Sequence, residues 1–443
     1  MAGTFTSQNK VRPGAYIVFK AVRQSNLATG ERGIVVLPMT LPWGKTGEFI
    51  PVTVADFTGG NTLAQIGLSI TDAGIQVLRE VLKNASKALV WKLNADAVKA
   101  TKLLMTGITA TAAQGGTLGN SIIVSCVENA ASALELITTV NGLEVDRQVV
   151  TTVASYVPNG WITLAGTGTV AFAEFAGVTL EGGTAGAAVT DTNWTGAFNA
   201  ATTEVWNVFA AASASGTLPA LVATYIENLR ENEGKKVQAV VNNYDSDYEG
   251  VISVDQGYKI GTEEVPVTSF IGWVAGATAG AEVNQSNTYK IVPGATDIIG
   301  AKSASQIEAG LQAGKFILSR RQDLSIVVEK DINTLHTFGQ DRSYVFSKNR
   351  VIRCLDDIAT QVTKLFENSY IGKVDNNASG RTLFKGDIIG YLTTLENLGA
   401  IQNFDSTTDL EVIAGNDIES VVVNLAVQTV DSMEKLYMTV VVS

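Results

Sequence analysis

The sequence predicts a multidomain protein of the α+β and α/β classes. It would have a β-sandwich insertion, an α/β middle domain, an α+β C-terminal core domain and extended terminal arms. The 443-residue chain is long enough for two to four domains, at roughly 150 residues each. Its composition, 46% hydrophobic and 17% charged, provides for a sizeable core. The spacing of apolar residues also changes repeatedly along the chain between alternation and helical periodicity.

These changes divide the chain into six expected segments. They are an N-terminal arm, a region that packs with the middle domain, the β-sandwich insertion, the α/β domain, the C-terminal core domain and a C-terminal arm. Their expected bounds are 1–24, 25–97, 98–190, 191–335, 336–430 and 431–443.

The first two segments contain a strand-like run and then a strand and a helix. Residues 15–22 are apolar or aromatic on both faces apart from Lys20, which is typical of a strand buried on both sides or held by a partner. Residues 33–38 read as a strand. A helix starts at Thr71-Asp72 and lines one face with Ile75, Leu78, Val81 and Leu82.

The insertion is acidic and rich in short strands. Residues 103–226 hold one basic residue, Arg147, against eight acidic ones. Strands separated by glycine turns are expected at 121–127, 149–153, 161–164 and 170–175, and this spacing indicates a sandwich.

The α/β and C-terminal domains alternate helices with strands. Helices are expected at 202–212, 218–232, 268–277, 304–313, 349–369 and 387–398. Strands are expected at 236–242, in a hairpin of 316–319 with 325–329, and at 410–414, 418–429 and 435–442.

Few residues are arranged for catalysis or metal binding. Gly44-Lys45-Thr46 lacks the first glycine of a phosphate loop, because Met39 stands there, so a turn is favoured. Asp245, Asp247 and Glu249 open like a calcium loop, but Gln256 replaces the final carboxylate, and a solvated acidic turn is favoured.

The remaining reactive side chains are expected to be structural. His336 lies near no nucleophile motif, and a neutral structural imidazole is favoured. Cys126 and Cys354 are isolated thiols, typical of a reducing compartment. The six tryptophans are scattered, as core or interface anchors are.

The distribution of charge and the two chain ends stand out instead. Residues 342–385 carry eight basic and four acidic side chains, whereas residues 386–443 carry one and nine. This order suggests docking onto protein surfaces, although an ordinary solvated surface also accounts for it. Residues 435–442 alternate two largely apolar faces, so this strand must pair internally or join another subunit's sheet.

Several stretches resemble contractile-tail sheath proteins from phages of Gram-positive bacteria and their defective-prophage relatives. They are GTFTSQNKVRPGAYIVFKA (3–21), GIVVLPMTLPWG (33–44), AVVNNYDSDYEGVISVDQG (239–257), and the block that runs from KNRVIRCLDD (348–357) to SMEKLYMTVVV (432–442). The similarity keeps the order of the segments over nearly the whole chain, and it includes no catalytic signature.

The resemblance implies a structural subunit, not an enzyme, that polymerises around a tail tube and contracts to drive the tube through a bacterial envelope. In the family, both arms add strands to neighbouring C-terminal domains, which here implies Ala15, Tyr16, Ile17, Val18 and Phe19, and Lys435, Leu436, Tyr437, Met438, Thr439 and Val440. Residues 24–30 and 429–434 would be hinges. The basic residues implied to face the tube are Arg350, Arg353, Lys373, Arg381 and Lys385.

The expected partners are further copies in stacked helical rings, the tail tube protein, and the baseplate and tail terminator proteins. The sandwich would face outward. The subunit would reside in a virion tail or a headless phage-tail-like particle, after assembly in the host cytoplasm. No cofactor or metal is expected. Direct nucleic-acid binding is not expected at a net charge of −11, nor is stable membrane insertion, because no apolar run approaches about 20 residues.

Three alternatives stay open from the sequence. The particle could be a headless, bacteriocin-like device. The chain could be a tail tube or capsid subunit. It could also be an enzyme that uses a metal at Asp245, Asp247 and Glu249.

Overall fold

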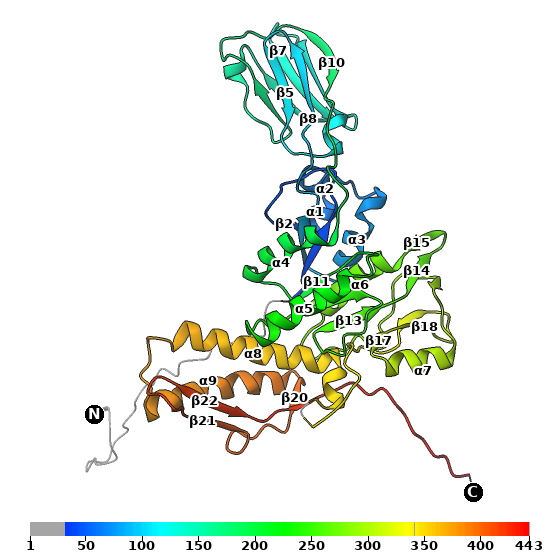
Figure 1. The fold of residues 1–443 in the computed structure, drawn as a ribbon, viewed down its shortest axis with the longest axis vertical. Helices are drawn as coiled ribbons and strands as arrows, with labels where there is room; N and C mark the ends of the chain where they lie inside the picture. Colours follow the sequence, from blue (N-terminus) through cyan, green and yellow to red (C-terminus); the bar gives the residue numbers. More distant parts are fainter. Residues whose placement is uncertain (1–31, 341, 443) are drawn as a thin grey trace, which may run out of the picture. The chain divides into compact units, whose positions relative to one another are not determined.

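A computed structural model describes residues 32–340 and 342–442, and Figure 1 labels its elements. The chain divides into two compact units. Of the described residues, the larger unit contains 32–340, 342–360 and 431–442, and the smaller unit contains 361–430. The multidomain mixed α/β fold predicted from the sequence is confirmed, including its β-sandwich.

A seven-stranded sheet forms the centre of the larger unit, in the order β17-β13-β12-β11-β1-β3-β2. Neighbouring strands are parallel except for β2 and β3. Strands that precede the sandwich insertion in the sequence and strands that follow it therefore form one sheet. Their bounds are β1 Ile34–Met39, β2 Ile50–Thr53, β3 Lys87–Lys92, β11 Val208–Ala210, β12 Gln238–Asn242, β13 Val251–Val254 and β17 Lys315–Phe316.

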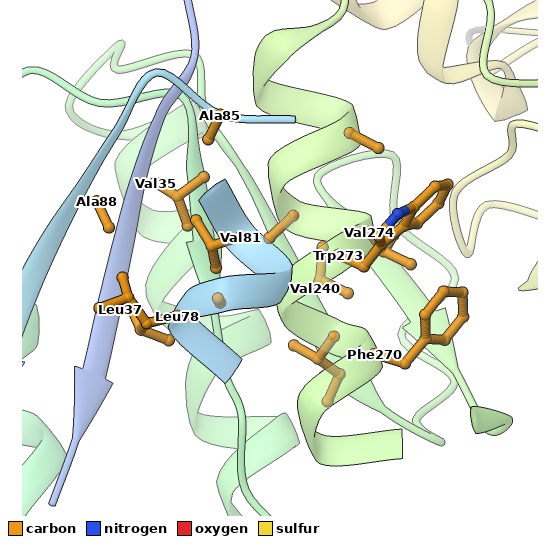
Figure 2. Close-up of a cluster of buried hydrophobic side chains, with 14 of the residues drawn as sticks. Val35, Leu37, Leu78, Val81, Ala85, Ala88, Val240, Phe270, Trp273 and Val274 are labelled. Atoms are coloured by element: carbon orange, nitrogen blue, oxygen red, sulfur yellow. The ribbon is translucent and has the colours of Figure 1, made fainter. Parts of the chain in front are cut away.

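Helices cover both faces of this sheet. Val35 and Leu37 of β1 pack with α3 (Gln76–Leu82) and α6 (Val267–Gly280), as Figure 2 shows. Ile34 and Val36 point to the opposite core, which includes α4 (Trp194–Thr203) and α5 (Leu218–Glu231). Alternate residues of the parallel strand β1 thus enter two different cores. Because both of its faces are buried, the sequence of β1 is apolar throughout.

Three glycines let α6 approach α3 closely. Gly272, Gly276 and Gly280 recur every four residues, so they share one helix face. A Cβ at Gly276 would lie only 2.3 Å from the Val81 carbonyl oxygen, and one at Gly272 would lie 2.6 Å from that of Val77. A larger residue would therefore push the two helices apart.

The sandwich contains a four-stranded sheet, β10-β6-β7-β8, and a three-stranded sheet, β4-β5-β9. Side chains from both sheets share one core, which includes Ile108, Val124, Leu136 and Ile162. Asn141 and Gly142 turn the chain from β7 to β8, both with positive φ. The strand bounds are β4 Thr101–Met105, β5 Ile108–Ala112, β6 Ile122–Glu128, β7 Leu134–Val140, β8 Leu143–Val149, β9 Ile162–Ala165 and β10 Phe175–Thr179.

The smaller unit packs helices against short strands. Phe384, Ile388 and Leu395 of α9 are buried, as is Leu410 at the start of β21. The unit's elements are α9 Ala378–Asn397, β20 Ile401–Gln402, β21 Leu410–Ala414, β22 Val421–Leu425 and β23 Gln428–Thr429. Helix α8 (Asn349–Ser369) contributes residues to both units.

The remaining elements lie in the larger unit. They are α1 Val54–Thr58, α2 Thr62–Ile66, α7 Ala304–Gln312, β14 Gly257–Ile260, β15 Glu263–Val265, β16 Asp297–Ile299, β18 Leu318–Arg320 and β19 Ile326–Val328. Helices within the described ranges lack the combination of length and apolarity needed to cross a membrane.

Several expected elements were wrong. The helix at 202–212 is replaced by the end of α4 and by β11, because Val208 and Phe209 enter opposite cores. The strand expected at 149–153 is wrong, because the hairpin of β7 and β8 already ends at Val149. The strand expected at 170–175 is replaced by β10, which begins at Phe175.

One error concerns the C-terminal part. The helix expected at 387–398 starts at Ala378, where the Asn377 side chain accepts a hydrogen bond from the backbone N–H of Gly380. Residues 435–442 form no strand with another described part of this chain, so their donation to another subunit stays a prediction.

We predict that Gly276→Ala destabilises the larger unit by about 1–3 kcal/mol, because the new methyl group overlaps the backbone of α3. Gly386→Ala is the matched control, since its Cβ would enter open space on α9, where alanine favours the helix. Chemical denaturation measures both variants. Equal stability of Gly276→Ala and wild type would contradict the close approach of the helices.

Candidate assembly interface

Residues 436–442 of the C-terminal arm present apolar side chains to solvent. Leu436, Tyr437 and Met438 are 84%, 88% and 74% exposed, and Val440 to Val442 are similarly open. In Figure 1 the arm ends as a single trace with no strand beside it. The predicted N-terminal positions, Ala15, Tyr16, Ile17, Val18 and Phe19, and the expected hinge at 24–30 lie outside the described residues.

A buried cation fixes the root of the C-terminal arm. The Lys348 ammonium is 5% exposed and contacts Asp431 at 3.0 Å and also Glu434. The Thr288 hydroxyl donates a further hydrogen bond to Glu434 at 3.0 Å. Burial lowers the pKa of Lys348, but hydrogen bonds to Glu434 and Asp431 outweigh it, so the net pKa is raised. The expected hinge at 429–434 is thus tied down at its C-terminal end.

The smaller unit offers two free strand edges. In the β21–β22 hairpin, Gly415 N–H bonds to Ser420 and Ala426 N–H bonds to Asp409, which sets the alternation of the ladder. Val412 and Ala414 on β21, and Val421 and Val423 on β22, consequently direct their backbone groups outward. No partner for these outward groups occurs among the described residues.

One of the five basic candidates is buried. Arg353 is 2% exposed and contacts Asp331 at 2.8 Å. A second buried pair, Arg230 with Asp356 at 2.7 Å, lies on the same half of α8. Both pairs hold the first turns of α8 within the larger unit, so Arg353 is not available at the surface of this chain.

The other four candidates differ in exposure. Lys373 is exposed and donates to the Asn368 carbonyl oxygen. Arg381 donates to the side chain of Asn376 at 2.9 Å and is half-buried, as is Lys385. Arg350 is half-buried too, and burial lowers the pKa of its guanidinium.

The acidic turn expected at Asp245 and Asp247 binds the only histidine in the sequence. Asp247 accepts backbone hydrogen bonds from His336 at 2.8 Å and Thr337 at 2.9 Å. The His336 imidazole Nδ1 lies 3.0 Å from the Thr334 carbonyl oxygen and 3.3 Å from Asp247 Oδ1. The Thr334 carbonyl raises the pKa of His336, and the two carboxylates add to the effect.

The remaining candidates are structural in the described ranges. Gly44-Lys45-Thr46 lies in the bend between β1 and β2, and no helix follows it directly. Cys126 and Cys354 are buried and form no disulfide, and burial raises the pKa of Cys354 to about 12. All six tryptophans are buried. The described residues contain no cluster of three His, Cys, Asp or Glu side chains suited to a metal.

Four family models match successive parts of the chain. They describe the N-terminal region of domain III of the tail sheath protein Gp18 (residues 32–93), the phage tail sheath β-sandwich domain (95–187), the phage tail sheath central domain (187–334) and the phage tail sheath C-terminal domain (341–443).

Individual proteins show the same relationship. A curated relative is the phage-like element PBSX protein XkdK of Bacillus subtilis, which is 36% identical over all of this chain and 99% of its own. A solved sheath tail protein of Desulfitobacterium hafniense is 38% identical, with a TM-score of 0.83 over 96% of this chain and 99% of its own. The contracted helical sheath of the anti-feeding prophage shares the fold, with 12% identity and a TM-score of 0.57 over 98% and 99% of the chains.

We predict that protonation of His336 stabilises the fold. Its raised pKa in the folded chain means that this stabilisation is complete below the unfolded pKa of about 6.5 and is lost as pH rises through the folded value. The stability difference between wild type and His336→Gln should therefore be larger at acidic than at alkaline pH. Because solvent screens this partly exposed group, the change should stay under about 1 kcal/mol. NMR titration of the single imidazole measures this pKa directly, and a value below that of a model peptide would contradict the prediction.

Proposed function

The chain belongs to the phage tail sheath family and is a structural subunit of a contractile tail sheath, and we propose that its terminal arms join neighbouring subunits by β-strand exchange. The expectation of a sheath subunit, not a tail tube or capsid subunit, is confirmed by the four sheath domain matches. Subunits of this kind act as oligomers, so the unfinished surfaces of a single chain are the place to look for contacts between copies.

One observation carries this proposal: the described chain has an exposed apolar segment that joins no sheet, and a hairpin whose outer edges have no partner among the described residues. Residues 436–442 are exposed, and the outer edges of β21 and β22 have no partner in the described ranges. Adding a strand to an edge satisfies backbone groups through main-chain hydrogen bonds and depends little on side-chain identity. The arm and the hairpin of two copies would therefore complete each other.

Strand exchange also suits a sheath that changes shape. The Lys348 clamp fixes where the arm leaves its own subunit, and the strand pairing fixes where it ends in the next. Lys435, which lies between the Glu434 contact and the exposed segment 436–442, can change direction while both attachments persist. The subunits would thus stay connected during contraction, and no cofactor or nucleotide is needed for the connection itself.

We further propose that the surface-accessible basic residues of the C-terminal region contribute to tube binding. Lys373, Arg381, Lys385 and Arg350 remain in this set, whereas Arg353 is removed because it is buried. The proposed partners are the tail tube protein, the baseplate proteins and the tail terminator. Assembly would take place in the host cytoplasm, in an infectious virion or in a headless phage-tail-like particle.

Deleting residues 436–443 should abolish cylinder formation and leave the monomer folded. The truncation retains Asp431 and Glu434, so the clamp on Lys348 survives, and we expect the melting temperature to stay within about 2 °C of wild type. Negative-stain electron microscopy and thermal denaturation test the two parts. A truncated chain that unfolds, or one that still forms cylinders, would contradict strand donation by this arm.

A proline on either free edge should block assembly without unfolding the hairpin. Val423→Pro and Ala414→Pro each remove an N–H group that points outward and bonds to nothing within the described chain. Val423→Thr keeps both the N–H group and a β-branched side chain, and it should assemble normally. Normal cylinders formed by both proline variants would show that neither edge accepts a strand.

A further inference from the structure

The smaller unit contains a largely apolar cavity. Its volume is about 500 Å³, and it lies between the end of α8, the start of α9 and the turn before β22. Phe366, Tyr370 and Phe384 form its floor, and the Phe384 ring lies 5.3 Å from that of Phe366 and 4.7 Å from that of Tyr370. Ile371 and Ile418 form an exposed rim, at 56% and 92% exposure.

Several polar groups around this cavity are already bonded. The Tyr370 hydroxyl donates to Asp387, and Arg381 donates to the Asn376 side chain at 2.9 Å. The Asn376 amide in turn donates to the carbonyl oxygens of Ile418 and Ser420. These groups have less need of a polar ligand. Asp375 and Glu419 also belong to the lining, whose remainder is mostly the three aromatic rings and aliphatic side chains. The cavity therefore suits an apolar side chain.

The cavity adjoins a free strand edge. Val421 lines the cavity and is also the first residue of β22, whose outward backbone groups are unpaired among the described residues. A strand added beside β22 would consequently pass across the mouth of the cavity. Its inward-facing side chains would point toward the aromatic floor.

The C-terminal arm has the side-chain pattern that this position requires. In an extended strand, Leu436, Met438 and Val440 would lie on one face, whose only heteroatom is the thioether sulfur. The other face would carry the hydroxyl groups of Tyr437 and Thr439 beside Val441, so it is the more polar of the two. An edge strand with one solvated face buries its apolar side. Methionine is unbranched and makes favourable contacts between its sulfur and aromatic rings, so Met438 suits a floor of three rings.

We propose that the cavity is the receptor for Leu436 and Met438 of a second copy's C-terminal arm. The inference rests on the strand exchange proposed above and adds the edge, β22, and the face of the arm that is buried. Same-face residues of a strand are about 6.6 Å apart, so two neighbours can reach one cavity. Each copy supplies one arm and one cavity, so every cavity within a polymer can be filled.

Paired cysteines test this assignment in the full-length protein. Protein carrying Met438→Cys is mixed with protein carrying Ile418→Cys, assembled and oxidised. The native Cys126 and Cys354 are buried, so they contribute little background. The control replaces Met438→Cys by Thr439→Cys, whose side chain lies on the opposite face. We expect about tenfold more disulfide-linked dimer from the Met438 pair than from the control, because a disulfide needs Cα atoms within about 7 Å.

Other outcomes overturn the assignment. If Thr439→Cys forms as much disulfide as Met438→Cys, the arm does not bury the face that carries Met438. If Ile418→Cys links to Tyr16→Cys or Phe19→Cys instead of Met438→Cys, the cavity binds the N-terminal arm. A second readout compares Met438→Lys with Thr439→Lys by electron microscopy, and only Met438→Lys should lose cylinders. If both lysine variants assemble, the cavity is not the receptor. Strand donation by this arm is tested separately, and it fails if the chain lacking residues 436–443 still assembles.

Discussion

The outward backbone hydrogen-bonding groups of β21 and β22, which have no partner among the described residues, are the constraint on which assembly of this subunit depends. A free edge together with an exposed apolar segment invites association, and globular proteins usually cover or charge such edges. Here the outer edges carry Val412, Ala414, Val421 and Val423, and the arm carries Leu436 to Val442. In a sheath subunit these features are complementary, because the same chemistry that would cause aggregation in a monomeric protein joins identical copies in a fixed register.

The structure around these surfaces is held by buried ion pairs. Arg353 with Asp331 and Arg230 with Asp356 attach the first turns of α8 to the larger unit, and Lys348 with Asp431 and Glu434 attaches the root of the arm. Breaking such a pair from one side leaves a buried charge, which is costly, so each pair specifies its position strongly. The arm therefore leaves its own subunit from a defined point, and the residues beyond the clamp, 435–442, are all exposed.

Much of the fold follows from local patterns, whereas the site depends on contacts between distant residues. Helix α8 was predicted with its observed bounds because Val351, Leu355, Ile358, Val362 and Leu365 follow one face, and β21 because Leu410–Ala414 is a short β-rich run. The helix expected at 202–212 failed because Val208 and Phe209 enter two cores, which gives a continuous apolar run without a period. The β7–β8 hairpin was missed although Asn141-Gly142 is a strong turn signal, and so was the glycine repeat of α6. By contrast, the burial of Arg353, the pairing of His336 with Asp247 and the aromatic cavity bring together residues far apart in sequence, and no local pattern indicates them.

The central claim is that the backbone of this chain finds its full set of partners only in the polymer. Hydrogen–deuterium exchange of residues 410–425 and 436–442, compared between monomer and assembled sheath, tests it most directly. We expect rapid exchange in the monomer at the outward-facing amides of Val412, Ala414, Val421 and Val423 and along the arm, and strong protection of an edge and the arm together in the sheath. Equal exchange in the two states, or protection of these amides already in the monomer, would contradict it.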